Sequence, residues 1–344
     1  MIELALIGAG WIGRIHAEAI GKSTACRLVA LCDPDPSAEA LAKTWQARYY
    51  RDYRELLARE NVQGAVIAAP NHLHYSITEA SAGKGVHILL EKPIATSLDE
   101  ADRLIAAAEK NQIKLLVGHQ RRFNPAVEKT RDLIKSGELG KLIGVNVMWT
   151  LRKSDDYFAP AWRKEKGAGP ILNNLIHDLD NIRFICGDVA RVYAESAHDA
   201  RGLEVEDSAV IILRLTSGAM VSIFITDASP APWAYELTTG DNPDFPRQRE
   251  NCYFFFGTEA SFSFPQGRKN YYQDQAQGGW KEELITEDIA LPAGSPYERQ
   301  ISHFCRVIRG EEEAKTSGRD ARRTLAVINA VKESAETGRA VDLT

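Results

Sequence analysis

The sequence predicts two domains: an α/β domain built on a parallel sheet, followed by an α+β domain built on a mostly antiparallel sheet. Strand-like and helix-like segments alternate through the first 120 residues, whereas the middle of the chain carries consecutive strand-like runs joined by short turns. The length of 344 residues also suits two cores better than one, because a domain commonly holds roughly 150 residues.

The first domain is expected to cover residues 1–121. Its runs at 65–69 and 86–90 are almost continuously apolar, which is typical of parallel strands buried on both faces. The expected strands lie near residues 2–7, 28–33, 65–69, 86–90 and 114–117. Ligands of such sheets lie beyond the carboxyl ends of the strands, so the residues that follow each strand are the candidate binding residues.

A glycine motif, G-x-G-x-x-G, follows the first strand and opens a helix; it comprises Gly8, Gly10 and Gly13, with Trp11 and Ile12 inside it. The first glycine permits a tight turn, the second lets a pyrophosphate approach the backbone, and the third lets the helix pack on the strand. Free N–H groups at the helix start would hold the anion. The motif predicts a doubly wound Rossmann domain that binds a dinucleotide, although such a glycine-rich turn can also simply join a strand to a helix.

The second strand ends at Asp33, which lies 20 residues after Gly13, where a carboxylate meets the adenosine ribose. This position favours NAD over NADP. Asp33 could instead cap the next helix, but Asp35 suits that role better. Arg48 and Arg51 could meet the 2′-phosphate of NADP, yet neither directly follows the strand.

Later strand ends carry further polar residues, among them Pro70-Asn71-His72, Glu91-Lys92-Pro93 and Gly118-His119-Gln120. The Lys92 amine could hydrogen-bond a substrate hydroxyl and stabilise developing alkoxide charge. The alternative is a surface lysine paired with Glu91.

The second domain is expected at 122–316, beginning with a helix from Pro125 to about Ser136. Its strands are expected at 142–151, 189–197, 208–215, 219–227, 251–256 and 260–264, with a hairpin turn at 216–218. Helical patterns return at 297–309 and 318–336, and the segment 317–344 is expected to pack back on the first domain.

A second polar constellation lies in a helix that opens with a glycine turn at Gly167 and has Pro170 in its first turn. Asn173, His177 and Asp180 are spaced i, i+4 and i+7, so they would share one face. The opposite, buried stripe would consist of Leu172, Leu175, Ile176, Leu179, Ile182 and Cys186. Because its ordinary pKa is about 6.5, a histidine here could accept the proton of an alcohol; a merely solvated helix face is the alternative.

Composition excludes several other classes. A net charge of −5 without a basic cluster argues against nucleic-acid binding. The five cysteines lack a C-x-x-C motif and the histidines lack ligand spacing, so we expect reduced thiols in the cytoplasm and no metal site. We also expect neither a signal peptide, because the chain has Glu3 and enters its first strand at once, nor a membrane span, because no stretch approaches the roughly 20 apolar residues that one needs.

The glycine motif, the turn at 70–74, Glu91-Lys92-Pro93 and Ile176-His177-Asp178 together resemble the Gfo/Idh/MocA family of NAD(P)-dependent oxidoreductases, which includes inositol and sugar dehydrogenases. The resemblance spans essentially the whole chain. It implies that Lys92 and His177 form a catalytic pair and that Trp162-Arg163 contacts the cofactor. It further implies that the open sheet of the second domain forms the interface of a homodimer or homotetramer.

One position departs from this family, since many of its inositol and sugar dehydrogenases have an aspartate where this chain has Asn173. An amide can hydrogen-bond a substrate hydroxyl but cannot stabilise an imidazolium by charge. Arg121, Arg122 and Arg163 admit a substrate that carries a carboxylate, because the planar guanidinium suits that group. They could equally bind the cofactor pyrophosphate or form structural ion pairs.

These observations predict an NAD-dependent dehydrogenase that oxidises a secondary hydroxyl of a sugar, a cyclitol or a related hydroxy acid without a metal. Lys92 would polarise the oxygen, His177 would accept its proton and Asn173 would position the substrate. Expected substrate contacts are Lys92, Arg121, Arg122, Asn173, Asn174 and His177. Expected cofactor contacts are Gly8, Gly10, Trp11, Ile12, Gly13, Asp33, Pro70, Asn71, His74, Glu91, Lys92, Trp162 and Arg163. The alternatives are a non-catalytic NAD(P)-binding regulator and a carbonyl or dihydrodiol reductase of the same family.

Overall fold

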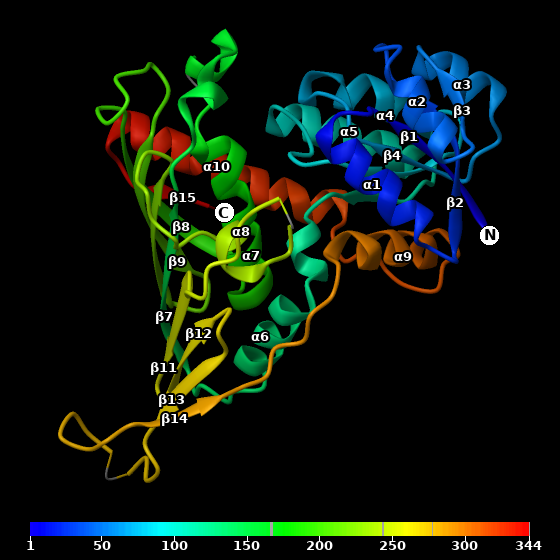
Figure 1. Ribbon diagram of the computed structural model, residues 1–344. Coiled ribbons are helices and arrows are strands. Elements are labelled where there is room, and N and C mark those ends of the chain that lie inside the picture. Colours follow the sequence, from blue (N-terminus) through cyan, green and yellow to red (C-terminus); the bar gives the residue numbers. More distant parts are fainter. Residues whose placement is uncertain (166–167, 243, 277, 344) are drawn as a thin grey trace. The chain divides into compact units, whose positions relative to one another are not determined.

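The computed structural model describes residues 1–165, 168–242, 244–276 and 278–343, without the side chain of Trp162 (Figure 1). The chain divides into two compact units, residues 1–124 with 295–325 and residues 125–294 with 326–344. This division differs from the expected boundaries at 121 and 316. The reason is that α9 (Pro296–Ile308) buries its apolar face in the core of the first unit, beside α1 (Trp11–Gly21).

The first unit contains a parallel sheet of six described strands in the order β3-β2-β1-β4-β5-β6. Its strands are β1 (Ile2–Ile7), β2 (Cys26–Cys32), β3 (Arg48–Tyr50), β4 (Gly64–Ile67), β5 (His87–Leu90) and β6 (Leu115–Val117). This order is that of a Rossmann domain, which confirms the predicted fold class. The sequence reading missed β3, because three residues at a sheet edge give no apolar run.

Helices cover both faces of this sheet, as the alternation along β1 shows. Leu4 and Leu6 pack into a core with α1 and α9, whereas Ala5 and Ile7 pack into the core on the other face. The helices of the unit are α1, α2 (Ala38–Thr44), α3 (Tyr53–Arg59), α4 (His74–Ala82), α5 (Leu98–Lys110), α9 and the start of α10 (Gly318–Thr337), with 3₁₀ helices η1 (Asn71–Leu73) and η2 (Gln120–Phe123). The remainder of α10, from Ala326, belongs to the second unit, which differs from the expected packing of 317–344 on the first domain.

The second unit contains a sheet of nine described strands in the order β14-β13-β12-β11-β7-β10-β9-β8-β15. They are β7 (Leu142–Thr150), β8 (Val189–Ala197), β9 (Ser208–Leu215), β10 (Met220–Thr226), β11 (Tyr253–Gly257), β12 (Ala260–Phe264), β13 (Arg268–Tyr271), β14 (Ile285–Asp288) and β15 (Val341–Asp342). Every pairing between these strands is antiparallel except that of β7 with β10, which confirms the mostly antiparallel sheet.

One face of this sheet carries the core of the unit, against α6 (Pro125–Lys135), α7 (Ile176–Cys186) and the end of α10 (Figure 1). The remaining helices of the unit are α8 (Tyr235–Thr239), the 3₁₀ helices η3 (Asp155–Phe158) and η4 (Ala161–Lys164), and the π-helix η5 (Ile171–Leu175). Because side chains alternate along a strand, the opposite face presents exposed residues such as Val210, Ile212 and Phe224. Across the described chain, no helix has the length and apolar character that a bilayer span requires.

Candidate functional site

The glycine motif forms a tight turn between β1 and α1 in which two of its glycines are required by packing. Gly8 has a φ of +101°, and a Cβ there would lie 2.4 Å from the Ala68 carbonyl oxygen. A Cβ on Gly13 would lie 2.1 Å from the Gly8 oxygen. Gly10, at the cap of α1, has no atom within 4 Å of such a Cβ, so the space before the helix start is open. The fold therefore needs Gly8 and Gly13, whereas the open space at Gly10 suits an approaching ligand.

Asp33 is held against this turn, because its Oδ2 accepts a hydrogen bond from the Ala9 N–H at 2.7 Å and its Oδ1 accepts one from the Asp35 N–H at 2.9 Å. Helix α2 begins after Ser37 without a side-chain cap, so the expected capping by Asp35 is not seen; Asp35 instead accepts from the N–H of Ser37 at 2.9 Å, and this bond lowers the pKa of Asp35. Asp33 is thus fixed at the end of β2, beside the glycine turn. This placement supports a contact with a ribose over a capping role.

The two arginines considered for a 2′-phosphate have different partners. Arg48 pairs with Glu60, whereas the Arg51 guanidinium donates to the Pro34 carbonyl at 3.3 Å, next to Asp33.

The turn at 70–74 follows β4 at the same sheet edge. Pro70 and Asn71 are exposed there, whereas His74 is fully buried. The His74 ring nitrogens lie 3.0 Å from the carbonyl oxygens of Pro93 and of Ala69, and burial lowers its pKa. His74 therefore joins the ends of β4 and β5, a structural role that does not favour the expected direct contact with the cofactor.

Glu91, which precedes Lys92, makes a buried contact that the sequence reading missed. Its Oε1 lies 2.7 Å from Nε2 of His16 on α1, and its Oε2 accepts from the Lys92 backbone N–H at 3.2 Å. Burial by itself would raise the pKa of Glu91, but the interactions of its carboxylate with His16 and Lys92 together outweigh burial, and the pKa is lowered. Gly118 leaves the necessary room, since a Cβ there would lie 2.7 Å from Oε1. The available signal was a histidine on the buried face of α1, and its partner could not be predicted.

In the second unit, His177 occupies the first turn of α7, directly after the π-helix η5. Among Ile176–Ile185, all within the described chain, only His177 is not buried. Asp180 is 1% exposed, and Asp178 is equally buried and accepts a hydrogen bond from the Tyr253 hydroxyl. The expected polar face shared with Asp180 is therefore wrong. From Asp178 to Ile185, helix α7 is buried around its whole circumference, and the π-helical turn before it breaks the spacing assumed for Asn173.

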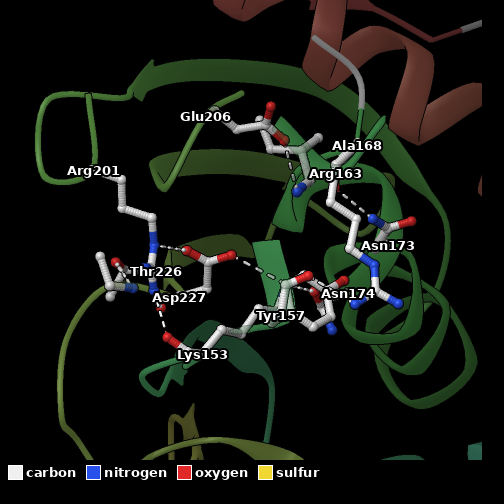
Figure 2. Close-up of polar contacts among 12 residues, drawn as sticks. Lys153, Tyr157, Arg163, Ala168, Asn173, Asn174, Arg201, Glu206, Thr226 and Asp227 are labelled. Atoms are coloured by element: carbon white, nitrogen blue, oxygen red, sulfur yellow. Dashed lines mark hydrogen bonds and ion pairs between the residues drawn. The ribbon is translucent and has the colours of Figure 1, made fainter. Parts of the chain in front are cut away.

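Asn173 and Asn174 lie in that π-helix and have different neighbours (Figure 2). The Asn173 amide donates to the Ala168 carbonyl at 2.6 Å, whereas the Asn174 Oδ1 accepts from Lys153 Nζ at 3.0 Å. The expected glycine turn at Gly167 lies outside the described residues.

Glu206 fixes the start of this segment, since it accepts from the Ile171 N–H at 3.1 Å, and burial raises its pKa. A Cβ on Gly169 would lie 2.2 Å from the Glu206 carboxylate, so a larger residue here would displace that carboxylate.

The arginines expected near a substrate have mainly structural partners. Arg122 is buried and its Nη2 lies 2.5 Å from Asp320 Oδ2, so it forms the ion pair that the sequence left open. Arg121 is buried as well. Arg163 donates to the Tyr157 carbonyl at 2.8 Å, with its guanidinium 4.1 Å from the centre of the Tyr157 ring. The side chain of Trp162 lies outside the described part of the chain.

The structure thus gathers the glycine turn, Asp33 and Glu91-Lys92 at one sheet edge of the first unit. It gathers Asn173, Asn174 and His177 at one helix start of the second. Among the described residues, no group of three or more His, Cys, Asp or Glu side chains could hold a metal ion.

Comparison with known proteins identifies the family. The model of the NAD-binding Rossmann domain of the GFO/IDH/MocA oxidoreductase family matches residues 2–119, and the model of the family's C-terminal domain matches residues 127–263. The chain belongs to the Gfo/Idh/MocA family. This confirms the expected family and the oxidoreductase class.

Proteins similar to this chain include two dehydrogenases. A D-apiose dehydrogenase of Paraburkholderia graminis is 30% identical over 98% of this chain and 89% of its own length. An inositol 2-dehydrogenase of Rhizobium meliloti is 26% identical over 99% of each chain. The crystal structure of an oxidoreductase from Agrobacterium radiobacter in complex with NAD+, L-tartaric acid and magnesium is 25% identical, with a TM-score of 0.82 over 99% of this chain and 98% of that one.

These relationships also confirm NAD as the cofactor. The residues present fit it, because the space at Gly10 is open to a pyrophosphate and Asp33 is fixed where a ribose is expected.

Proposed function

We propose that this chain is an NAD-dependent dehydrogenase that oxidises a secondary hydroxyl of a sugar, a cyclitol or a related hydroxy acid without a metal. The observation that carries the proposal is that His177 is the one residue of the segment 176–185 that is not buried; its side chain is partly accessible. A partly accessible imidazole near two amides can exchange a proton with a bound alcohol. The dehydrogenase names of the D-apiose and inositol relatives support a hydroxyl-rich substrate.

Two residues would carry the chemistry. Lys92 donates a hydrogen bond to the substrate oxygen and stabilises the negative charge that develops there. His177 accepts the hydroxyl proton as the C–H electron pair leaves with the hydride, and bound NAD supplies the hydride acceptor. Asn173 positions the substrate through its amide. The buried His16–Glu91 pair holds the Lys92 main chain, since Glu91 accepts from the Lys92 N–H.

The test starts with a screen of sugars, inositols and hydroxy acids against NAD and NADP, followed by absorbance of the reduced nicotinamide. Lys92→Met and His177→Ala should each lower kcat at least about a hundredfold on the best substrate, because each removes a group acting in the transition state. The affinity for NAD, measured by calorimetry, should stay nearly unchanged.

Matched controls are Lys84→Met and His198→Ala, both at exposed positions outside the site. They should leave kcat as in the wild type. Near-normal turnover in both the Lys92 and His177 variants would refute the assignment, and a wild type that oxidises no compound would favour a regulator or a reductase.

We also propose that the protein assembles as a homodimer or homotetramer through the exposed face of the second sheet. The large apolar residues on that face are Ile143, Val210, Ile212, Met220, Phe224 and Phe256. Val210, Ile212 and Phe224 are 48%, 49% and 44% exposed, on neighbouring strands that a partner could cover. Light scattering should give a dimer or tetramer for the wild type and a smaller species for Phe224→Glu; a monomeric wild type would contradict the proposal.

The expected compartment is the cytoplasm. All five cysteines lie in the described part of the chain and carry free thiols, which supports a reducing environment.

A further inference from the structure

A lysine that the sequence reading did not single out lies beside the π-helix η5. Lys153 follows β7, and Asp227 follows β10, the only described strand that pairs with β7 in parallel. The two segments stay together past the strand ends, because the Lys153 N–H donates to the Asp227 carbonyl oxygen at 2.9 Å. Their side chains therefore meet at one end of the sheet (Figure 2).

The Lys153 ammonium is fixed by its surroundings. Its Nζ lies 3.1 Å from Asp227 Oδ2 and 4.6 Å from the centre of the Tyr157 ring. The side chain of Lys153 is 12% exposed and that of Asp227 is 2% exposed. Arg201 Nε lies 3.2 Å from the other oxygen of Asp227, so the carboxylate is held from both sides. A buried carboxylate with two cationic partners is costly to rearrange, which keeps the ammonium in place.

This ammonium determines which way the Asn174 amide faces. An ammonium group only donates hydrogen bonds, so Asn174 must turn its Oδ1 toward Lys153, as the distance of 3.0 Å shows. The amide nitrogen Nδ2 therefore faces away from Lys153. Within the described residues it has no hydrogen-bond acceptor, and the side chain is half-buried. Two N–H groups are thus available at a fixed position, three residues before His177.

The placement of Asn174 points to a ligand more than to packing. The π-helical turn is a geometry that proteins use sparingly and often at functional sites. Asn173, its neighbour in this turn, donates a hydrogen bond through its Nδ2 to the Ala168 carbonyl. The two adjacent amides are thus fixed at different ends: Asn173 by its nitrogen and Asn174 by its oxygen. A hydroxyl-bearing substrate offers oxygen acceptors of the kind that the Asn174 N–H groups lack.

We propose that Lys153 is a positioning residue, which orients the Asn174 amide so that its Nδ2 donates a hydrogen bond to a hydroxyl oxygen of the substrate. The inference rests on the proposed function and adds a specificity determinant to it. Because this bond would form in the bound substrate and persist in the transition state, its loss should raise KM and leave kcat nearly unchanged.

The experiment is a double-mutant cycle on the best substrate of the screen. Asn174→Leu should raise KM about tenfold, with kcat within about threefold of the wild type. Lys153→Met should raise KM about fivefold in the wild-type background and have no further effect in the Asn174→Leu background, because it acts only through the amide. Lys153→Arg retains a donor-only cation and should restore KM to within about twofold.

Lys269→Met is the matched control, since Lys269 also lies near a carboxylate, Glu138, and an aromatic ring, Tyr271. It should leave KM unchanged. Melting temperatures of all variants separate a loss of folding from a loss of substrate affinity, and Asp227 keeps Arg201 as a partner when Lys153 is replaced.

The outcomes distinguish the two proposals. A wild type that oxidises no compound overturns the proposed function and this inference together. An active wild type with an unchanged KM in Asn174→Leu overturns this inference alone. The same holds if Lys153→Met raises KM equally in both backgrounds, or lowers only the melting temperature.

Discussion

Replacing Gly10 by alanine should separate the cofactor role of the glycine turn from its structural role. A Cβ at this position would meet no atom within 4 Å. The backbone has a φ of −64° and a ψ of −170°, values that alanine adopts without strain. The structure therefore predicts that Gly10→Ala folds normally. Its effect should fall on the cofactor, because the glycine at this position is expected to face the pyrophosphate.

The magnitudes follow from these observations. Alanine is a poorer cap than glycine by up to about 1 kcal/mol, but it also reduces the entropy of the unfolded chain by about 0.4–1 kcal/mol. The two effects nearly cancel, so the melting temperature should change by less than about 4 °C. A methyl group in the space for the pyrophosphate should remove at least one charge-assisted hydrogen bond, worth about 1.5–3 kcal/mol. The Kd for NAD should therefore rise about 10- to 100-fold.

The assay is calorimetric titration of the purified protein with NAD, together with thermal melting. Gly279→Ala is the matched control, because a Cβ there also meets no atom within 4 Å and its φ is not in the left-handed region. Gly13→Ala is the opposite case and should prevent folding, since its Cβ would lie 2.1 Å from the Gly8 oxygen. An unchanged Kd in a well-folded Gly10→Ala protein would refute the assignment of this turn to the pyrophosphate.

Three further predictions concern charge. Burial lowers the pKa of His74, His87 and His303 in the folded protein. In the unfolded chain the histidine pKa is about 6.5, so below this pH the unfolded chain binds more protons than the folded protein. The free energy of unfolding should consequently fall between pH 7 and about 5; urea melts across this range would show no fall if the reasoning were wrong. Asp33→Asn should raise the ratio of kcat/KM for NADP to that for NAD at least about tenfold, because it removes a charge that repels a 2′-phosphate; an unchanged ratio would count against the ribose contact. Arg122→Met should lower the free energy of unfolding by about 1.5–3 kcal/mol, because Asp320 loses its buried partner and keeps only the more exposed Arg323, and should not change the KM for an uncharged polyol. A normal stability with a raised KM would reassign Arg122 to the substrate.

Much of the fold could be predicted because its signals are local. The apolar runs that became β1, β4 and β5 alternate with helical patterns, and the glycine spacing after β1 identifies the turn. These features depend on neighbours a few residues apart, so periodicity reveals them. The strands β3 and β13–β15 were missed, because short polar segments become strands only when a neighbouring strand pairs with them.

The sequence by itself determined the fold class, the dinucleotide motif and the residue types of the candidate site, including Lys92, Asn173 and His177. Only the tertiary structure decided the partners of these residues. The pairing of His16 with Glu91 joins residues 75 positions apart, and the contact of Lys153 with Asp227 depends on the parallel pairing of β7 with β10. The burial of Asp180, which overturned the predicted polar face, likewise reflects the packing around α7 from Asp178 to Ile185. The physical reason is that chain connectivity fixes local patterns, whereas long-range side-chain contacts are selected by the packing of the whole core.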